Sequence, residues 1–519
     1  MTKPVRSALI SVYYKDKLDL IVRELHKNNV TIYSTGGTLQ FIESLGVPVV
    51  AVDALTGFPE ILGGRVKTLH PKVFGGILAR RDNASDLAQL EQHEIPEIDL
   101  VIVDLYPFEE TVKSAGEAGS FSFGEGWGEV IEKIDIGGIS LIRAAAKNFK
   151  DTLIVSSRDQ YDELLALLQA KNGGSDIADR KLFGAKAFMT TSHYDTLIFN
   201  YFNRDAHLPV FKQSILTAKT LRYGENPHQK GVFYGNLDEV FEILNGKELS
   251  YNNLVDVEAA INLAAEFTEP TFAIIKHTNS CGLASRATIS DAYAAALAGD
   301  PTSAFGGVLA ANRTIDVATA RQVSELFFEV LSAPDYEPEA LEILKQKKNR
   351  ILLKLVDGRR STVNGQRMFK SLLNGVLEQD IDSVSEKQDT FKPVTNRKPT
   401  AQELSDLEFA IIAVKHLKSN GITIVKNKQL IGMGCGQTSR VDSLESALKK
   451  AKAFGFDTTG AVMASEAFFP FPDCVNISHQ AGITAISQPG GSIKDQDSID
   501  AANANGQAMV MTGVRHFKH

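Results

Sequence analysis

The sequence is poor in the residues that build disulfide frameworks and metal sites. It has three cysteines, Cys281, Cys435 and Cys474, which are far apart along the chain. They are too few and too scattered for a disulfide scaffold or a structural zinc site. A zinc-dependent deaminase would need a His-x-Glu motif and a Pro-Cys-x-x-Cys motif, and the sequence has neither. We therefore expect a reduced, cytoplasmic protein whose chemistry needs no metal.

Long hydrophobic runs and an excess of positive charge are also missing. No apolar stretch approaches the roughly 18 residues of a membrane-spanning helix, and Lys15, Asp16 and Lys17 come before any signal-peptide core could form. The chain has 55 Lys and Arg residues against 63 Asp and Glu residues, a net charge of -8. An acidic chain has no electrostatic footprint for duplex nucleic acid or an anionic membrane, so we expect neither as a partner.

The remaining composition is that of an ordinary globular protein, with 519 residues of which 43% are hydrophobic. This length predicts roughly three or four packing units. In the first third, short apolar runs alternate with helical patterns, which predicts an α/β fold with a doubly wound parallel sheet and ligands at the carboxyl ends of its strands. The expected strands are 5–12, 30–34, 47–52, 98–106 and 152–156, and the expected helices are 17–28, 38–45 and 159–170. The Gly- and Ser-rich stretch 114–128 indicates a long surface loop.

The best candidate for a domain boundary is the stretch 203–213, after which the α/β pattern changes but continues. Expected strands there are 271–276, 306–311, 421–425, 429–433, 460–464, 483–487 and 508–512, and expected helices are 289–297, 316–331, 401–417 and 442–454. Residues 303–312 and 458–467 resemble one another, which indicates a duplicated subdomain joined by the polar stretch 383–399. The predicted domains are 1–205, with a core of about 1–150, and 206–519, divided into subdomains of about 206–385 and 386–519.

Four N-terminal segments combine shaped backbone with groups that suit phosphate: Ser34–Thr38, Gly63–Pro71, Asp104–Pro107 and Asp135–Gly138. The first is Gly-rich between a strand and a helix, and the second carries Arg65, Lys67, Thr68 and His70. Taken singly, each is also compatible with a glycine turn, a solvated basic loop or a helix cap. Four such segments in one small sheet favour a phosphate-bearing substrate.

The C-terminal part contains further polar motifs, of which Lys276-His277 at the end of an apolar strand is the most informative. Histidine can act as a general base near neutral pH, and an adjacent lysine can stabilise an oxyanion, although such pairs are commonly only solvated. The Gly-rich segment Gly432–Arg440 fits neither a P-loop nor a dinucleotide fingerprint. The other candidates are Leu221–Gln229, Phe468–Asp473, Gln488–Ser492 and Arg515–His519.

Together these segments resemble one family, the bifunctional AICAR transformylase / IMP cyclohydrolase of purine biosynthesis. The matching motifs are GGRVKTLHP, DIGGISLIRAAAKN, LRYGENPHQ, IIKHTNSCG, SAFGG, GMGCGQTSR and RHFKH, in the family order over essentially the whole chain. The resemblance implies a methylglyoxal-synthase-like cyclohydrolase followed by a transformylase of two cytidine-deaminase-like subdomains without zinc. It implies formyl transfer from 10-formyltetrahydrofolate to AICAR, then closure of formyl-AICAR to inosine monophosphate by a homodimer.

The resemblance also implies roles for individual residues. The nucleotide, chiefly its phosphate, would be held by Ser11, Lys15, Ser34, Gly36, Gly37, Thr38, Arg65, Lys67 and Thr68. Tyr106, Asp135 and Lys147 would face the reacting groups in ring closure, again with Lys67. In formyl transfer, His277 would be the base and Lys276 would stabilise the oxyanion and the departing folate nitrogen. AICAR would be bound, or its pocket shaped, by Arg222, Tyr223, Asn253, Asn420, Arg440, Phe468 and Arg515, with Asp473 contacting folate.

One segment departs from the family pattern. The usual Ser-Asp-Lys-Thr-Gly after the first strand is Tyr13-Tyr14-Lys15-Asp16-Lys17 here, which keeps the lysine but changes its neighbours. Two alternatives to the bifunctional enzyme follow. One is a transformylase with impaired cyclohydrolase, and the other is a nucleotide-binding regulatory protein without catalysis. The retained Lys67, Asp135, Lys147, Lys276 and His277 argue against the second alternative.

Overall fold

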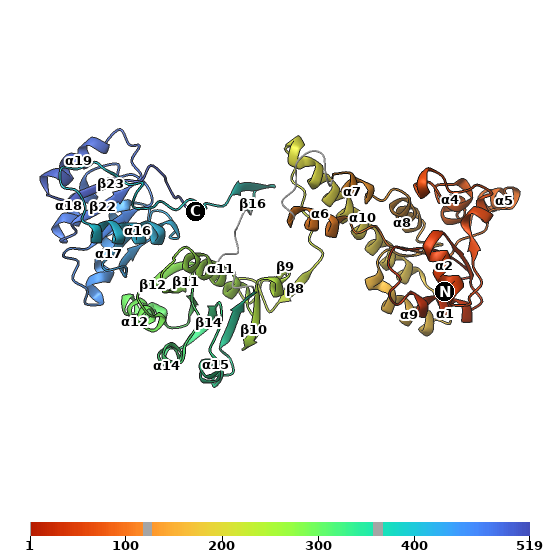
Figure 1. The fold of residues 1–519 in the computed structure, drawn as a ribbon, viewed down its shortest axis with the longest axis horizontal. Coiled ribbons are helices and arrows are strands. Elements are labelled where there is room, and N and C mark those ends of the chain that lie inside the picture. The colour runs from red at the N-terminus through yellow and green to blue at the C-terminus, as the bar shows by residue number, and fades with distance from the viewer. Residues whose placement is uncertain (1, 118–126, 357–366) are drawn as a thin grey trace. The chain divides into compact units, whose positions relative to one another are not determined.

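The computed structural model describes residues 2–117, 127–356 and 367–519 (Figure 1). Its contacts divide the chain into two compact units, residues 1–216 and 217–519. The predicted boundary stretch overlaps the end of one helix, Ile177–Ala206, and residues 207–217 form no helix or strand. The domain limits drawn from the sequence, including the division of the second unit near residue 385, stay predictions.

The first unit is built on a five-stranded parallel sheet in the order β4–β3–β2–β5–β6. Its strands are β2 (Ser7–Ser11), β3 (Thr31–Ser34), β4 (Val50–Ala51), β5 (Leu100–Val103) and β6 (Leu153–Val155), and a separate pair joins β1 (Lys3–Pro4) to β7 (Gly174–Ser175). The strand order reverses between β2 and β5. Ligands of open α/β sheets bind at the carboxyl ends of the strands beside such a reversal.

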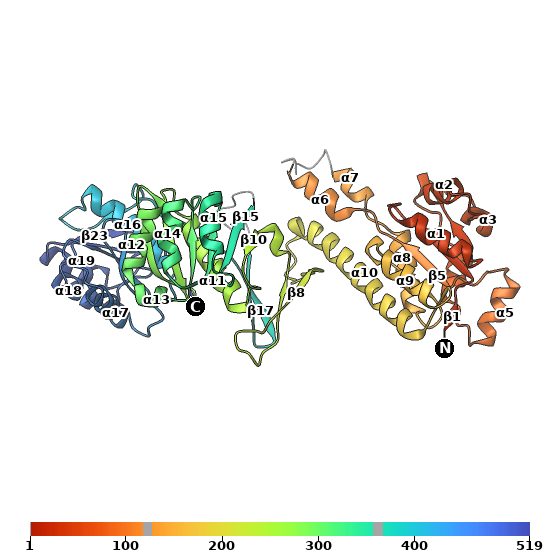
Figure 2. The same ribbon diagram turned by 90° about the horizontal axis from the view of Figure 1, so that it is seen from below.

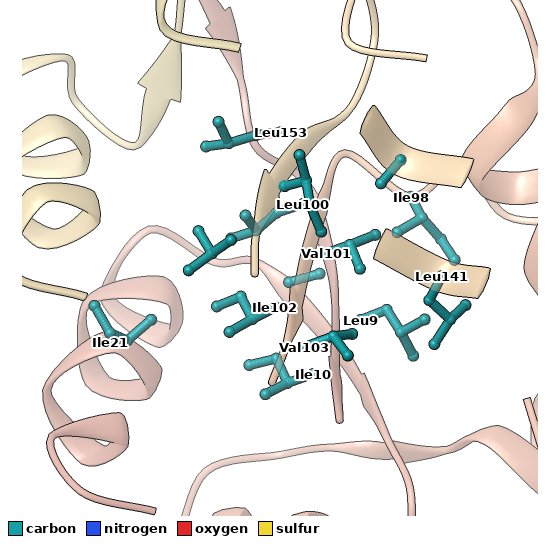
Figure 3. Close-up of a cluster of buried hydrophobic side chains, with 14 of the residues drawn as sticks. Leu9, Ile10, Ile21, Ile98, Leu100, Val101, Ile102, Val103, Leu141 and Leu153 are labelled. Atoms are coloured by element: carbon teal, nitrogen blue, oxygen red, sulfur yellow. The ribbon is translucent and has the colours of Figure 1, made fainter. Parts of the chain in front are cut away.

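Helices cover both faces of this sheet, as a doubly wound fold requires. They are α1 (Leu18–Lys27), α2 (Gly36–Ser44), α3 (Val52–Thr56), α4 (Pro71–Leu78), α5 (Ala84–Gln92), α6 (Phe108–Glu117), α7 (Trp127–Glu132), α8 (Gly137–Lys147), α9 (Tyr161–Ala170) and α10 (Ile177–Ala206), with short 3-10 turns at Leu62–Gly64 and Arg158–Gln160. Ile21 of α1 and Leu141 of α8 approach the buried strands from opposite sides (Figure 3). The apolar spacing of α1 buries Leu18, Ile21, Val22 and Leu25, as its sequence predicts.

Two features of this unit differ from the sequence prediction. Part of the expected loop 114–128 is helical, because α6 extends to Glu117 and α7 begins at Trp127, while 118–126 lie outside the described residues. The 30-residue helix α10, seen along its length in Figure 2, was not predicted. Tyr194 and Tyr201 of α10 bury themselves against Phe108 of α6 and Val130 of α7. Tertiary packing therefore stabilises helices in a stretch whose local composition is typical of a loop.

The second unit contains two six-stranded sheets with matching topology: β10–β15–β14–β13–β11–β12 and β18–β23–β22–β21–β19–β20. Neighbouring strands pair in the same order in both sheets: antiparallel, parallel, parallel, antiparallel and antiparallel. The first has β10 (Phe241–Asn245), β11 (Thr271–Lys276), β12 (Asn279–Ser285), β13 (Gly307–Ala311), β14 (Phe328–Ala333) and β15 (Ile351–Leu355). The second has β18 (Lys392–Pro393), β19 (Ile422–Val425), β20 (Leu430–Gly434), β21 (Val462–Ser465), β22 (Ala485–Gln488) and β23 (Ala508–Met511). The similar segments lie on β13 and β21, so the duplication predicted from them is confirmed.

The remaining elements of this unit are helices and two separate hairpins. The helices are α11 (Tyr251–Ala265), α12 (Ile289–Gly299), α13 (Pro301–Ala304), α14 (Val317–Glu325), α15 (Pro338–Lys345), α16 (Ala401–Lys415), α17 (Arg440–Ala453), α18 (Asp473–Gln480) and α19 (Asp495–Ala504), with a 3-10 turn at Leu237–Glu239. The hairpins pair β8 (Ala218–Leu221) with β9 (Gly231–Tyr234), and β16 (Arg367–Leu372) with β17 (Gly375–Asp380). Within the described ranges, no helix is long and apolar enough to cross a membrane.

The duplication extends to the turns at the ends of two equivalent hairpins. His277 and Thr278 join β11 to β12, and Asn427 and Lys428 lie between β19 and β20; all four residues have positive φ. Two consecutive left-handed residues are the signature of a type I′ turn. In each copy, an aspartate from the preceding helix accepts hydrogen bonds from turn amides. Asp256 of α11 bonds Thr278 N at 2.7 Å, and Asp406 of α16 bonds the amides of residues 427 and 428 at 2.9 and 2.7 Å.

One helix prediction in this unit is wrong. The expected helix 316–331 ends at Glu325, and Phe328–Ala333 form strand β14 between β13 and β15. Val330 and Leu331 are fully buried in the sheet. A short continuous apolar run is compatible with both a buried helix and a buried strand, and pairing with two neighbouring strands decides between them here.

Candidate active sites

The predicted phosphate-binding residues of the first unit gather at the carboxyl ends of β2 and β3. Ser11 ends β2 and Ser34 ends β3, beside the reversal of strand order. Ser11 Oγ lies 3.3 Å from Thr35 Oγ1, whereas Ser34 Oγ donates to the carbonyl oxygen of Ile10 at 2.7 Å. The buried Ser34 hydroxyl therefore stabilises the contact between the ends of β3 and β2. Ser11 is partly accessible, and Thr35 is the N-cap residue of α2.

The start of α2 is shaped for a close approach to its backbone. Gly36 has a φ of +48°, and a Cβ there would lie 3.8 Å from Lys67 Nζ, whereas a Cβ on Gly37 would meet nothing within 4 Å. The N-cap residue Thr35 makes no side-chain capping bond. Thr38 Oγ1 instead donates to Val12 O at 2.9 Å and so ties the helix to the turn after β2. A helix N-terminus with a lysine beside it favours an anionic group.

Lys67, Tyr106 and Asp135 form an electrostatically coupled group at this edge of the sheet. Burial raises the pKa of Asp135, opposed by the Gly138 and Ile139 amides and by the charge of Lys67. Gly138 N donates to the Asp135 carboxylate at 2.6 Å, so this residue also caps α8. Burial, followed by the charge of Asp135, raises the pKa of Tyr106. The group therefore holds a cation, a carboxyl with a raised pKa and a phenol.

Three further residues predicted for this site complete the picture. Thr68 is buried, and its Oγ1 would lie 3.1 Å from a Cβ on Gly137, at the start of α8. Arg65 is exposed and forms an ion pair with Glu132. Lys147 is exposed and is the last of the 11 residues of α8. A helix of that length spans about 16 Å, so Lys147 and Asp135 lie at opposite ends of it.

The unusual turn after β2 is organised by Asp104, which begins the candidate segment Asp104–Pro107 but has no predicted role in it. The amides of Tyr13 and Tyr14 both donate to its carboxylate, the second at 3.0 Å. Lys15 Nζ folds back onto the carbonyl oxygens of Val12 and Tyr13, at 2.5 and 3.0 Å. The ring of Tyr13 meets that of Tyr106 edge to face, with centroids 5.6 Å apart. An aspartate directly after a fully buried parallel strand is the sequence signal that could have identified Asp104.

In the second unit, Lys276 and His277 are presented by the turn between β11 and β12. His277 is exposed on the turn, whose shape is fixed by the Asp256 hydrogen bond. Lys276 Nζ donates to Phe305 O at 2.5 Å. Gly306 has a φ of +70°, and a Cβ there would be 3.5 Å from Lys276 Nζ. The SAFGG loop therefore packs against the lysine, and the exposed rings of Phe305 and Phe327 lie beside each other with centroids 5.0 Å apart.

The second sheet contributes Asn420 and Arg440, which contact one another. Arg440 is buried at the start of α17 and donates to Asn420 Oδ1 at 2.9 Å and to Glu466 Oε2 at 2.6 Å. Asn279, directly after the His277 turn, accepts a hydrogen bond from Lys418 N at 3.3 Å. The hairpin of the first sheet that carries His277 is therefore attached to the segment that leads to Asn420.

Other predicted residues of this unit occupy distinct settings. The Arg222 guanidinium lies over the Tyr223 ring at 5.4 Å, and this loop is joined to α11 by Asn252, which donates to Glu225 O at 3.1 Å. Asn253 is buried in the capping box of α11, where its side-chain oxygen accepts from Ser250. Phe468 is half-buried, Asp473 is exposed at the start of α18, and the exposed Arg515 lies over the Phe517 ring at 4.3 Å.

Metal-ligand geometry is not found in the described parts of either unit. Among residues 2–117, 127–356 and 367–519, no group of three or more His, Cys, Asp or Glu side chains could hold a metal ion. The three cysteines are free thiols, and burial raises the pKa of Cys281 and of Cys474 to about 12. A thiol with so high a pKa is a poor nucleophile at neutral pH.

Comparisons with known proteins agree with this arrangement. Residues 18–140 match the family described as "MGS-like domain", and residues 145–450 match the family described as "AICARFT/IMPCHase bienzyme". A relative from Bacteroides thetaiotaomicron, named "Bifunctional purine biosynthesis protein PurH", is 56% identical over 100% of this chain and 99% of its own. Relatives of the same name from Persephonella marina and Acetivibrio thermocellus are 45% and 47% identical, each over 99% of this chain and 100% of its own. The family match over more than half of the chain and these full-length relatives show that the chain belongs to the AICARFT/IMPCHase bienzyme family.

Proposed function

We propose that the two units of this purine-biosynthesis bienzyme carry out consecutive reactions. In residues 217–519, a formyl group passes from 10-formyltetrahydrofolate to the 5-amino group of AICAR. In residues 1–216, the resulting formyl-AICAR closes to inosine monophosphate with loss of water. The observation that carries the proposal is the Lys276 ammonium on the Phe305 carbonyl beside His277, because a base and a cation on one fixed turn suit acyl transfer.

Formyl transfer needs help at the attacking nitrogen, because the AICAR amine is deactivated by its ring. His277 removes a proton from this amine as its nitrogen forms a bond to the formyl carbon. Lys276 stabilises the negative charge that develops on the formyl oxygen, then supports protonation of the folate nitrogen as its bond to carbon breaks. The lysine is held next to the turn by Phe305 O, so little reorganisation is needed at the moment of reaction.

The remaining predicted residues of this unit bind and orient the substrates. The exposed guanidinium groups of Arg222 and Arg515 suit the AICAR phosphate, which guanidinium binds bidentately. The charge of Arg440 is balanced by Glu466, so this arginine acts by orienting Asn420. Tyr223, Asn253 and Phe468 shape the AICAR pocket, and Asp473 contacts the folate.

Ring closure requires the carboxamide nitrogen to attack the formyl carbon and water to leave. Amide nitrogen is a poor nucleophile, so positioning and proton transfer supply most of the rate. Lys67 stabilises the oxyanion of the carbinolamine, and Asp135 and Tyr106 exchange protons with the nitrogen and the departing hydroxyl. A raised carboxyl pKa suits Asp135 to this exchange. Lys147 lies outside this cluster in the protomer, and its role stays a prediction.

The experiment that tests the proposal supplies the purified protein with AICAR and 10-formyltetrahydrofolate and no added metal. Joint appearance of tetrahydrofolate and inosine monophosphate supports both activities. Tetrahydrofolate with accumulating formyl-AICAR would contradict the ring-closure assignment, and AICAR binding with neither product would contradict catalysis altogether. The Asp104 hydrogen bonds that hold the unusual turn favour the first result. Assembly as a homodimer and a cytoplasmic location are further proposals that rest on the family resemblance.

A further inference from the structure

The segment Arg515–Lys518 contains a buried histidine that the proposed mechanism does not use. The side chain of His516 is 2% exposed. Its Nδ1 lies 2.6 Å from Asp382 Oδ2, and its Nε2 lies 3.0 Å from Glu386 Oε2. A neutral imidazole has one N–H, so it could donate to only one of two carboxylates. With both carboxylates ionised, both ring nitrogens must donate, so the geometry favours the imidazolium.

Both carboxylates belong to a stretch that is itself anchored to the two halves of the second unit. Lys415 of α16 donates to Val384 O at 2.9 Å, between the two acidic residues. The same ammonium donates to Glu266, which follows α11, at 2.6 Å. The segment that carries Asp382 and Glu386 is thereby attached to the ion pair between Lys415 and Glu266. This ion pair connects the helices that cover the two six-stranded sheets.

The main chain around His516 is attached to the substrate-binding residues. His516 N donates to Glu466 O at 3.0 Å, and the Glu466 carboxylate holds Arg440. Lys518 O accepts from Ser419 N at 2.9 Å, and Lys518 N donates to Ser419 Oγ at 3.1 Å. Ser419 directly precedes Asn420. The segment therefore contacts both sides of the Arg440–Asn420 pair and carries Arg515 itself.

We infer that His516 is a positioning residue of the formyl-transfer site, whose imidazolium, held between Asp382 and Glu386, fixes Arg515 and Asn420 for AICAR binding. This inference rests on the proposed function, because it takes Arg515 and Asn420 as AICAR-binding residues. His516 does not touch the reacting atoms. It acts by holding its segment in place before AICAR binds. Without this contact, the segment would have to become ordered on binding, and the cost of that ordering would weaken the affinity for AICAR.

The charge on His516 makes this tether dependent on pH. Burial alone would lower the pKa of His516, but hydrogen bonds and charge interactions with Asp382 and Glu386 outweigh it and raise the pKa to about 9. Two further groups face the cluster of His516, Asp382 and Glu386. They are Lys415 from α16 and, through its main chain, Glu466 after β21. A raised histidine pKa stabilises the folded segment fully below 6.5, and this contribution is lost as pH rises through about 9.

The test uses the full-length enzyme with His516→Gln, Asp382→Asn and His516→Lys, and His479→Gln as a control at an exposed histidine. Each variant is assayed for formyl transfer, for closure of supplied formyl-AICAR and for AICAR binding by calorimetry. We expect His516→Gln to raise KM and Kd for AICAR about tenfold, with kcat changed much less, because it removes charge-assisted hydrogen bonds. Ring closure reports on the other unit and should not change. His479→Gln should match the wild type.

Two comparisons separate positioning from a merely structural role. KM for AICAR in the wild type should rise as the pH passes about 9, and this rise should be absent in His516→Gln, whose KM is already high. His516→Lys keeps a cation between the carboxylates and should restore a low KM that persists to higher pH. An unchanged KM in His516→Gln, or a loss confined to kcat, would overturn the inference.

Two further outcomes, misfolding of His516→Gln and the absence of formyl transfer in the wild type, also test the inference. If His516→Gln loses both activities through misfolding, Asp382→Asn gives the answer, since the Asp382 side chain is 44% exposed. A raised KM in that variant supports the inference, and an unchanged KM overturns it. If the wild type transfers no formyl group, the proposed function fails. The calorimetric Kd for AICAR then still supports the tether if His516→Gln weakens binding and overturns it if binding is unchanged.

Discussion

Lys276 Nζ donates to the carbonyl oxygen of Phe305 at 2.5 Å, which holds the ammonium beside the turn that presents His277. This contact joins the end of one strand to the loop before another, so the cation is fixed before substrate arrives. Preorganised charge of this kind contributes to catalysis because it does not have to be reoriented in the transition state.

His277→Ala should abolish formyl transfer while leaving ring closure of supplied formyl-AICAR intact. Loss of a general base typically lowers a rate by about 10²–10⁴-fold. The measurement is tetrahydrofolate release from AICAR and 10-formyltetrahydrofolate, followed by a separate assay with formyl-AICAR. His479→Ala, at another exposed histidine of this unit, serves as the control. Loss of both activities in His277→Ala would contradict the assignment of one reaction to each unit.

Asp135→Asn should reduce ring closure by about 10²-fold or more, yet leave the unit at least as stable at neutral pH. Because burial raises the pKa of Asp135 above its usual 3.8, ionising this carboxyl costs folding free energy as pH rises through the folded value. Asparagine removes that cost and can still accept the hydrogen bond from Gly138. Thermal unfolding across pH, together with the ring-closure rate, measures both effects. A lower Tm at neutral pH would show that the carboxylate is structural.

Gly36→Ala and Gly37→Ala form a matched pair at the start of α2. Alanine at position 36 must adopt a φ of +48° close to Lys67 Nζ, whereas alanine at position 37 meets open space. We expect Gly36→Ala to lose about 1 kcal/mol of stability and to weaken binding of inosine monophosphate. Gly37→Ala should leave stability nearly unchanged. Denaturant unfolding and nucleotide titration check both variants, and equal effects would contradict a site built on the Gly36 backbone.

Asp104→Ala should impair ring closure more than Tyr13→Ser does. The Asp104 carboxylate accepts both turn amides, so its removal leaves two donors without their partner and releases the turn. Tyr13→Ser keeps the amide and loses the edge-to-face contacts with Tyr106 and Tyr14 and the contact with the Lys133 ammonium, each worth about 1 kcal/mol. We expect at least a tenfold loss of kcat/KM in the first variant and at most a fewfold loss in the second. The reverse order would give the Tyr13 ring a direct part in substrate binding.

The sequence predicts all five strands of the parallel sheet in the first unit and five of the six strands of the second six-stranded sheet, but only β11 and β13 of the first six-stranded sheet. The spacing of Leu18, Ile21, Val22 and Leu25 specifies α1, and two similar segments identify β13 and β21 as equivalent strands. The strand β14 and the helix α10 were not predicted, because each depends on contacts with distant parts of the chain.

The candidate site residues also divide into those that local sequence can locate and those that depend on contacts with distant parts of the chain. Side chains that directly follow a strand, such as Tyr106 and His277, can be located from local pattern alone. The role of Asp104 requires knowing that the β2 turn lies beside the end of β5, a proximity of residues about 90 positions apart. The contact of Arg440 with Glu466 was likewise not predicted, because Arg440 begins α17 and Glu466 follows β21, so their proximity depends on the fold.

The paired hairpins show what duplication made available to this enzyme. An aspartate on the preceding helix shapes both turns, but one tip presents His277 and the other presents Lys428, whose ammonium forms an ion pair with Glu269 of the first half. One copy of the turn thus presents the proposed base, and its equivalent joins the two halves of the second unit. Because the fold is duplicated, one turn can carry an ion pair between the two halves while the equivalent turn keeps His277 exposed. The two turns can therefore specialise independently.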